Sequence, residues 1–324
     1  PMYMSRRMVE EHRVFLQAES ELAAVNMVLG AAVTGARAMT SSSSPGISLK
    51  QEGISYLAGC ELPAVIVNVQ RGGPGLGNIS GSQADYYQST RGGGHGDYRT
   101  LVLAPNSVQE MYSLTMLAFD LADKYRTPAL ILSDGIIGQM VEPMIMYQYK
   151  PLPLPEKNWR LDGCQGRPPR LVRSLFMGLG ELEKHNYKLA QKYTEIQAQE
   201  TRYENLKCDD ADLILIAFGA SARVCKEAVV TAREQKKRVG LFRPITLWPF
   251  PDQGLNLIIT QQDNLAKKLK RRMAQPQVLV VEMNLGQMVD DVKLALCNTG
   301  TKIHFFGRPG GAAITTEDIT GKIQ

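Results

Sequence analysis

Short apolar runs that alternate with helix-forming segments constrain the fold of this 324-residue chain more than any other feature. Such runs are typical of strands buried in a parallel sheet, where both faces are covered. They lie at Val65–Val69, Ala129–Leu132, Leu213–Ala217, Val239–Phe242 and Val278–Val281. The alternation predicts an α/β protein whose parallel sheets carry helices on both faces.

The same pattern divides the chain into two domains. We predict a first domain at residues 1–145, a Pro-rich connector with a charged linking helix at 146–207, and a second α/β domain at 208–324. The linking helix is expected over residues 181–207. Its one narrow apolar stripe consists of Leu182, Leu189, Tyr193 and Ile196.

Composition is that of a soluble globular protein, with 44% apolar and 21% charged residues. No stretch approaches the length of a membrane span, and no signal peptide is recognisable. The net charge of +5 is mild, and the basic run Lys267–Arg272 resembles a solvated helix face, so we expect no binding to nucleic acid. The mild positive charge is compatible with an acidic partner.

The five cysteines are scattered and form no C-x-x-C pair. Iron–sulfur clusters and structural zinc sites need clustered thiolates, so we expect this chain to hold neither. Unpaired cysteines also favour a reducing, cytoplasmic location.

The stretch from Glu21 to Gly46 carries the first functional signal. Glu21 precedes a thin apolar helix, rich in alanine and glycine, which a ligand can approach closely. An extended run and a Ser/Gly loop follow, at Ser41–Ser44 and Pro45-Gly46. We expect the Glu21 carboxyl group to be partly desolvated, which suits proton exchange with a heteroaromatic ring. The alternative is an exposed acid at a helix start, where the dipole favours negative charge.

Many motifs extend this signal along the chain. They are Ala36–Thr40, Pro45–Leu49, Gln51–Gly53, Val69–Gly75, Gly94–Asp97, Leu103–Pro105, Ser107–Glu110, Lys124–Pro128, Ser133–Gly135, Phe242–Pro249 and Glu282–Met288. Together they resemble, over nearly the whole chain, the alpha subunit of 2-oxoacid:ferredoxin oxidoreductases. Ser41–Ser44, Gly75–Asn78 and Gly92–His95 look most like the branched-chain (2-oxoisovalerate) type. The resemblance implies a pyrimidine-binding thiamine diphosphate domain, followed by an α/β domain like the C-terminal domain of transketolases.

The resemblance also implies how the site is shared. Glu21 would hydrogen-bond N1′ of the cofactor's aminopyrimidine ring, and Ser44, Pro45 and Gly46 would line the same cofactor. Thiamine diphosphate would then be shared with a beta subunit that supplies the diphosphate and Mg²⁺ site. Iron–sulfur clusters of the [4Fe-4S] type in partner subunits would pass electrons to ferredoxin, with coenzyme A as co-substrate. We therefore expect a hetero-oligomer built from paired alpha–beta units.

Arg71 and the glycine-rich segment after it are the next candidates. Arg71 follows a predicted strand, at the edge where open α/β sheets bind ligands, and its guanidinium group suits a substrate carboxylate. It could instead merely order the loop. Gly72 and Gly73 begin a tight loop over the substrate, which lacks the Lys-Ser or Lys-Thr ending of a phosphate-binding loop. His95 sits in a second glycine-rich loop, as an acid/base, a cofactor contact or simply a partner of Asp97.

Three polar residues near the first loop, Asn78, Gln83 and Asp85, cannot be assigned from one sequence. Ser133-Asp134-Gly135 imitates a diphosphate motif, but no matching asparagine follows, so Asp134 is expected to shape a turn. Residues 307–311 in the second domain are likewise expected to form a structural turn, and the alternative is that they reach an interface.

The start of the chain departs from the family pattern. Residues 1–11 already read as a helix, and the family's first strand, first helix and Tyr-Pro-Ile-Thr-Pro element are missing. We expect an incomplete record of a longer protein. Alternatives to the oxidoreductase remain another thiamine enzyme and a non-catalytic assembly subunit. Within the family, 2-oxoglutarate or another 2-oxoacid remains open as the substrate.

Overall fold

The computed structural model describes residues 2–268 and 276–323, without the side chains of residues 262–268. The basic run at 267–272 thus lies outside the described side chains. The helices are α1 Met2–Glu10, α2 Glu21–Val33, α3 Ser44–Gly59, α4 Tyr86–Arg91, α5 Val108–Tyr125, α6 Gly135–Gln139, α7 Glu181–Gln199, α8 Gly219–Glu234, α9 Asp252–Lys268, α10 Met288–Ala295 and α11 Thr316–Thr320. The strands are β1 Met39–Ser43, β2 Ala64–Gln70, β3 Leu101–Leu103, β4 Pro128–Asp134, β5 Tyr203–Leu206, β6 Leu213–Ile216, β7 Val239–Pro244, β8 Thr246–Trp248, β9 Gln277–Glu282 and β10 Ile303–Gly307.

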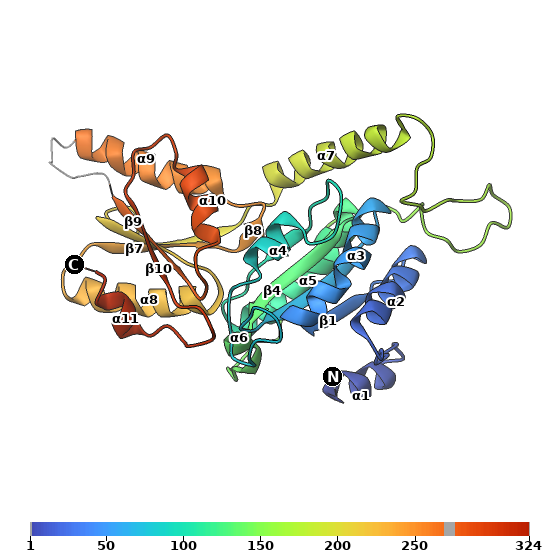
Figure 1. The fold of residues 1–324 in the computed structure, drawn as a ribbon, viewed down its shortest axis with the longest axis horizontal. Helices are drawn as coiled ribbons and strands as arrows, with labels where there is room; N and C mark the ends of the chain where they lie inside the picture. The colour runs from blue at the N-terminus through green and yellow to red at the C-terminus, as the bar shows by residue number, and fades with distance from the viewer. Residues whose placement is uncertain (1, 269–275, 324) are drawn as a thin grey trace.

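The described strands form two five-stranded sheets that lie side by side in the molecule (Figure 1). The first has the order β1-β2-β4-β3-β8, with β1 to β4 parallel and β8 antiparallel to β3. The predicted apolar runs become its inner strands β2 and β4, and every residue of β4 is buried. The prediction of a parallel sheet in a mixed α/β fold is confirmed.

The second sheet has the order β10-β9-β6-β7-β5. Its three predicted strands are confirmed as β6, β7 and β9, and β5 is antiparallel to β7. The predicted linking helix is wrong at its end, because α7 stops at Gln199 and β5 follows. Tyr203 stacks on Phe242 with ring centroids 4.9 Å apart, and this packing against β7 outweighs the charged, helix-like composition. Leu182 is also wrong as a packing residue, since it is 49% exposed near the start of α7, whereas Leu189 and Ile196 are buried.

One strand from the second half of the chain joins the first sheet. β8 comes from the second half of the chain but extends the first sheet, where Val102 pairs with Trp248. The predicted boundaries at 145 and 207 therefore stay predictions. Residues 140–180 contain no helix or strand and loop outward beyond α7 (Figure 1). Within the described residues, no helix combines the length and apolar character that crossing a membrane requires.

Candidate functional site

The carboxyl edge of the first sheet brings together most of the residues predicted for function. β1 and β2 end side by side, with Ser43 paired to Val69. The Ser/Gly loop predicted after β1 is wrong, because β1 runs through Ser43 directly into α3. Ser44, Pro45 and Gly46 form the first turn of that helix. Proline suits this position, since its fixed φ and missing N–H cost nothing in a first helical turn.

Glu21 lies at the start of α2, as predicted. The Ser20 side chain accepts a hydrogen bond from the Ala23 N–H at 3.2 Å and so begins the helix. The Glu21 side chain is half-buried against α3. A Cβ atom on Gly46 would lie 2.9 Å from Glu21 Oε1 and 2.8 Å from its Cγ. Only glycine at position 46 therefore allows the carboxyl group to rest on the first turn of α3, where the helix dipole favours a negative charge.

Lys50 is a functional candidate that sequence reasoning missed. It lies one turn beyond Gly46 on α3 and is only 1% exposed. Its Nζ donates to Thr40 Oγ1 at 2.9 Å and to the Ser41 carbonyl at 3.1 Å. Burial lowers the pKa of the Lys50 ammonium group, and the negative charge of Glu21 acts in the opposite direction. The signal in the sequence is a lysine four residues after Gly46, on a helix face that is otherwise small or apolar.

Arg71 follows β2 and is tied directly to Ser44. Its backbone N–H donates to Ser44 Oγ at 3.0 Å, which fixes the two strand ends against each other. One Nη donates to the Leu76 carbonyl at 3.3 Å, which closes the loop beneath the guanidinium group. Arg71 Nε is buried and has no hydrogen-bond partner among the described residues. A buried donor without a partner is costly, so this atom suits an incoming carboxylate or other anion.

The loop after Arg71 folds back on itself. Arg71 forms an isolated antiparallel bridge with Gly81, and the Gly72 N–H donates to the Ser80 carbonyl at 2.9 Å. A Cβ atom on Gly72 would lie 3.0 Å from the Asn78 side-chain carbon, whereas one on Gly73 would meet nothing within 4 Å. The loop is therefore compact, and the predicted tight turn is present.

His95 is the predicted site residue that the structure does not bring to this edge. It is exposed, and its loop packs on the middle of α3, where the Gly93 N–H donates to Gln51 Oε1 at 3.2 Å. Gln51 is five residues beyond Gly46, which places this contact about 7.5 Å further along the helix. Among the described residues, the His95 ring has no hydrogen bond, to Asp97 or to any other group.

Asp134 shapes the turn after β4, as predicted. Its carboxylate accepts from the Ile136 and Ile137 N–H groups at 3.1 and 3.0 Å and from the Ala220 N–H at 3.0 Å. Burial raises its pKa, while these donors act against the rise. All five cysteines are free, and the described part of the chain contains no group of three or more potential metal-binding side chains.

A cavity of about 1080 Å³ lies elsewhere, between the start of α5 and α8. Several of the charged groups that line it are already paired: Arg243 bonds Glu110 and Glu204, and Arg223 bonds Glu142 beside the cavity. Because the cavity does not include Glu21 or Arg71, the carboxyl edge of the first sheet remains the better candidate.

Comparison with known families identifies both halves of the chain. Residues 2–203 match the thiamine diphosphate-binding domain of pyruvate flavodoxin/ferredoxin oxidoreductases. Residues 211–319 match core domain II of pyruvate:ferredoxin oxidoreductase. These two models cover nearly the whole chain.

Curated relatives extend the match. The chain is 49% identical over 315 residues to the ketoisovalerate oxidoreductase subunit VorB of Methanothermobacter marburgensis, covering 96% of this chain and 84% of that protein. It is 33% identical over 342 residues to the 2-oxoglutarate synthase subunit KorA of Methanocaldococcus jannaschii, covering 98% of this chain and 88% of that protein.

Solved structures show the same fold. A 2-oxoglutarate:ferredoxin oxidoreductase from Magnetococcus marinus superimposes with a TM-score of 0.77 at 24% identity, over 99% of this chain and 59% of that one. A split-gene transketolase in an inactive β4 tetramer superimposes with a TM-score of 0.58 at 11% identity, over 99% of this chain and 87% of that one.

Proposed function

Because this chain belongs to the 2-oxoacid:ferredoxin oxidoreductase family, we propose that it is the alpha subunit of a complex that acts on 2-oxoisovalerate. The family is thiamine diphosphate-dependent and works through several subunits. In the proposed reaction the 2-oxoacid loses carbon dioxide, its acyl group passes to coenzyme A, and two electrons pass to ferredoxin.

The observation that carries the proposal is the edge shared by Glu21 and Arg71. A half-buried carboxyl group rests on the glycine of one strand–helix turn, and a guanidinium group with a free buried N–H follows the neighbouring strand. We assign the Glu21 carboxyl group to hold and exchange the proton at N1′ of the aminopyrimidine ring. We assign Arg71 to bind the substrate carboxylate through its free Nε. In this assignment the acid serves the cofactor and the cation serves the substrate.

The residues around Glu21 suit a flat ring. The absence of a side chain at Gly46 leaves the carboxyl group on the helix turn, and Ser44 and Pro45 complete the same turn. Thiamine diphosphate, when bound, supplies the electron sink that decarboxylation needs. Lys50 would keep a fixed positive charge behind Glu21 and exclude water from the interior side of the carboxyl group.

Other groups are assigned to partner subunits. Asp134 is buried and both of its carboxylate oxygens accept from backbone N–H groups, so it suits a structural role better than binding Mg²⁺. The five cysteines are isolated from one another and do not suit a [4Fe-4S] cluster. We therefore place the diphosphate and Mg²⁺ site in a beta subunit, and the clusters in a beta or iron–sulfur subunit that reduces ferredoxin. The free thiols favour a cytoplasmic complex.

The substrate assignment rests on two observations. The relative with 49% identity is named for ketoisovalerate, and those named for 2-oxoglutarate, such as the one from Methanocaldococcus jannaschii, are less similar. In addition, the loop beside Arg71 presents Leu76 and Ile79, which are 81% and 82% exposed and suit a branched aliphatic chain. A 2-oxoglutarate enzyme needs a second cation for the distal carboxylate.

The test uses the complex purified with its natural partner subunits. Coenzyme A-dependent reduction of ferredoxin or a viologen is measured with 2-oxoisovalerate, pyruvate, 2-oxoglutarate and indolepyruvate. We expect the highest kcat/KM with 2-oxoisovalerate. A preference for another oxoacid would refute the substrate but keep the class of reaction. No reduction with any of them, with thiamine diphosphate bound, would refute the catalytic role.

A further inference from the structure

The second sheet reverses its strand order between β6 and β9, as open α/β sheets that bind a ligand do. We call the position at the carboxyl ends of these two strands the crevice. β6 is followed through α8 by β7 on one side, and the chain later returns to form β9 on the other side of β6. The strand order therefore reverses between β6 and β9. In open α/β sheets, ligands bind at the carboxyl ends of the strands that flank such a point.

A side chain of the first domain fills this crevice. Gln83 is 0% exposed, and its Nε2 donates to the Phe218 carbonyl at 2.8 Å, in the turn after β6. Its Oε1 accepts from Ser221 Oγ at 2.8 Å and from the Met283 N–H at 3.0 Å, which begins the turn after β9. The backbone N–H of Gln83 also donates to the Met283 carbonyl at 3.1 Å. One amide thus bridges both strand ends at the reversal point.

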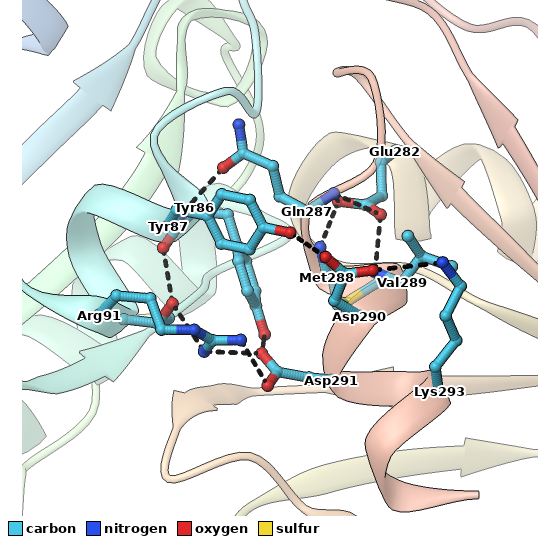
Figure 2. Close-up of polar contacts among 11 residues, drawn as sticks. Tyr86, Tyr87, Arg91, Glu282, Gln287, Met288, Val289, Asp290, Asp291 and Lys293 are labelled. Atoms are coloured by element: carbon cyan, nitrogen blue, oxygen red, sulfur yellow. Dashed lines mark hydrogen bonds and ion pairs between the residues drawn. The ribbon is translucent and has the colours of Figure 1, made fainter. Parts of the chain in front are cut away.

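The segment after Gln83 continues the contact. Figure 2 shows Tyr86, Tyr87 and Arg91 of α4 facing the acidic start of α10. Tyr86 donates to Asp291, Tyr87 donates to Asp290, and Arg91 forms two bonds to the Asp291 carboxylate. The Tyr87 N–H donates to Gln287 Oε1 at 2.8 Å.

The turn that receives this segment is itself rigidly held. Glu282, 0% exposed, accepts from the Met288 and Val289 N–H groups at 2.8 and 3.0 Å (Figure 2). Asn284 donates to the same carboxylate at 2.9 Å and to the Gln83 carbonyl at 2.8 Å. Burial raises the pKa of Glu282, and these donors act against the rise.

The seated segment is continuous with the loop beside Arg71. Gly81, which bridges to Arg71, is two residues before Gln83. The loop touches the second domain again where Asn78 Nδ2 donates to the Gly310 carbonyl at 2.7 Å. A Cβ atom on Gly311 would lie 2.5 Å from Ser80 Cβ, so the two loops are in close contact. The second domain therefore holds the loop at both its middle and its exit.

We propose that Gln83 acts as an internal ligand of the second domain and is a positioning residue for Arg71. By occupying the crevice between β6 and β9, it fixes the exit of the loop at residues 72–81 and with it the guanidinium group that faces the substrate. The inference rests on the proposed role of Arg71. It gives the second domain a part in substrate binding.

The test compares Gln83→Met, Ser221→Ala and a matched control, Gln109→Met, in the purified complex. Gln109 also makes two hydrogen bonds through its amide, to the backbone of Ile145, but these bonds are exposed and the half-buried residue lies on α5. KM and kcat for the preferred oxoacid are measured together with amide hydrogen exchange at residues 72–81. The Ser221 hydroxyl donates to Gln83 and is not part of the proposed substrate site, so its variant tests positioning apart from direct contact. It also covers the case in which Gln83→Met does not fold.

Gln83→Met should raise KM at least about tenfold and speed exchange in the loop, while kcat changes less than about threefold. Ser221→Ala, which loses one neutral hydrogen bond, should raise KM about two- to fivefold. Gln109→Met should leave both readouts at the wild-type level. Unchanged KM and unchanged exchange in Ser221→Ala and in a folded Gln83→Met would overturn the proposal. Arg71→Ala is measured in parallel: an unchanged KM there refutes the role of Arg71, and the exchange data still decide whether Gln83 holds the loop.

Discussion

The carboxyl edges of the two sheets are similar in architecture but differ in how their buried polar groups are hydrogen-bonded. At the first edge, Arg71 Nε is buried and finds no hydrogen-bond partner in the described part of the chain, and Glu21 lies half-buried on a glycine turn. At the second edge, Gln83 and Glu282 are both completely buried, and each bonds to several partners. An edge that keeps a free polar group can receive a ligand, whereas an edge whose groups are all satisfied serves as a joint. We therefore propose that the same architecture provides a ligand site in the first domain, whereas in the second it holds residues 83–91 in place, a contact that we call the clamp.

Glu21→Gln is the sharpest test of the first edge. The amide keeps the shape of the side chain but cannot exchange a proton in the same way, so kcat should fall at least about 100-fold. The measurement is coenzyme A-dependent reduction of ferredoxin by the purified complex. Assembly and melting temperature serve as controls and should match the wild type. Turnover near the wild-type level would contradict the assignment of Glu21.

Glu61→Gln tests whether the ion pairs of Glu61, which lies just before β2 at the end opposite to Arg71, stabilise the fold. Glu61 is buried, and although burial raises its pKa, Lys192 and Lys188 hold that pKa down at about 2. A depressed carboxyl pKa stabilises the fold above the unfolded value of 4.5, and this contribution is lost as the pH falls toward 2. The variant should therefore lose about 3 kcal/mol at neutral pH.

The measurement is the melting temperature of the variant and wild-type complexes from pH 7 downward. The gap between them should be widest above pH 4.5 and narrow below it. KM for the oxoacid should stay within about twofold of the wild type. A raised KM with unchanged melting would mean that the amino end of the sheet also serves the site.

Arg71→Ala tests the free donor directly. Losing charge-assisted hydrogen bonds to a carboxylate costs about 1.5–3 kcal/mol, so KM should rise about 10- to 100-fold. Arg71→Lys keeps the charge without the forked geometry and should recover only part of the loss. Steady-state kinetics with the preferred oxoacid provide the measurement. A wild-type KM in the alanine variant would leave Arg71 with only the role of ordering its loop.

Sequence reasoning predicted those parts of this arrangement that depend on local pattern. The buried strands β2, β4, β6 and β9 are recognisable in the sequence as apolar runs. A strand that is covered on both faces does not alternate between apolar and polar residues. Glu21 at a helix start and Arg71 at a strand end followed from the same local reading. The end of α7 did not, because the pairing of β5 with β7 depends on residues about 40 positions away.

The remaining functional detail depends on contacts between distant segments. The residues next to Lys50 in the sequence do not show that its side chain is buried. The burial depends on the packing of β1 and α2 against α3. Gln83 is 135 positions from Phe218 and 200 from Met283, so nothing near it in sequence marks it as buried. His95 shows the limit of the local reading, since the sequence does not reveal that its side chain is exposed and that its loop bonds to Gln51 on α3, so its role stays a prediction. Tertiary contacts, which one sequence does not display, decide these cases.

Tyr87→Phe should have the smallest effect, and it probes the outer end of the clamp. Burial and the Asp290 carboxylate raise the pKa of Tyr87 to about 12, so the phenol stays protonated and donates its hydrogen bond at every physiological pH (Figure 2). The pair is exposed, so its loss should cost less than about 1 kcal/mol and leave KM within about twofold of the wild type. Melting temperature and steady-state kinetics of the complex measure both quantities. A clearly raised KM would mean that the start of α4 also positions Arg71, and the positioning of Arg71 would then depend on the whole clamp rather than on Gln83 alone.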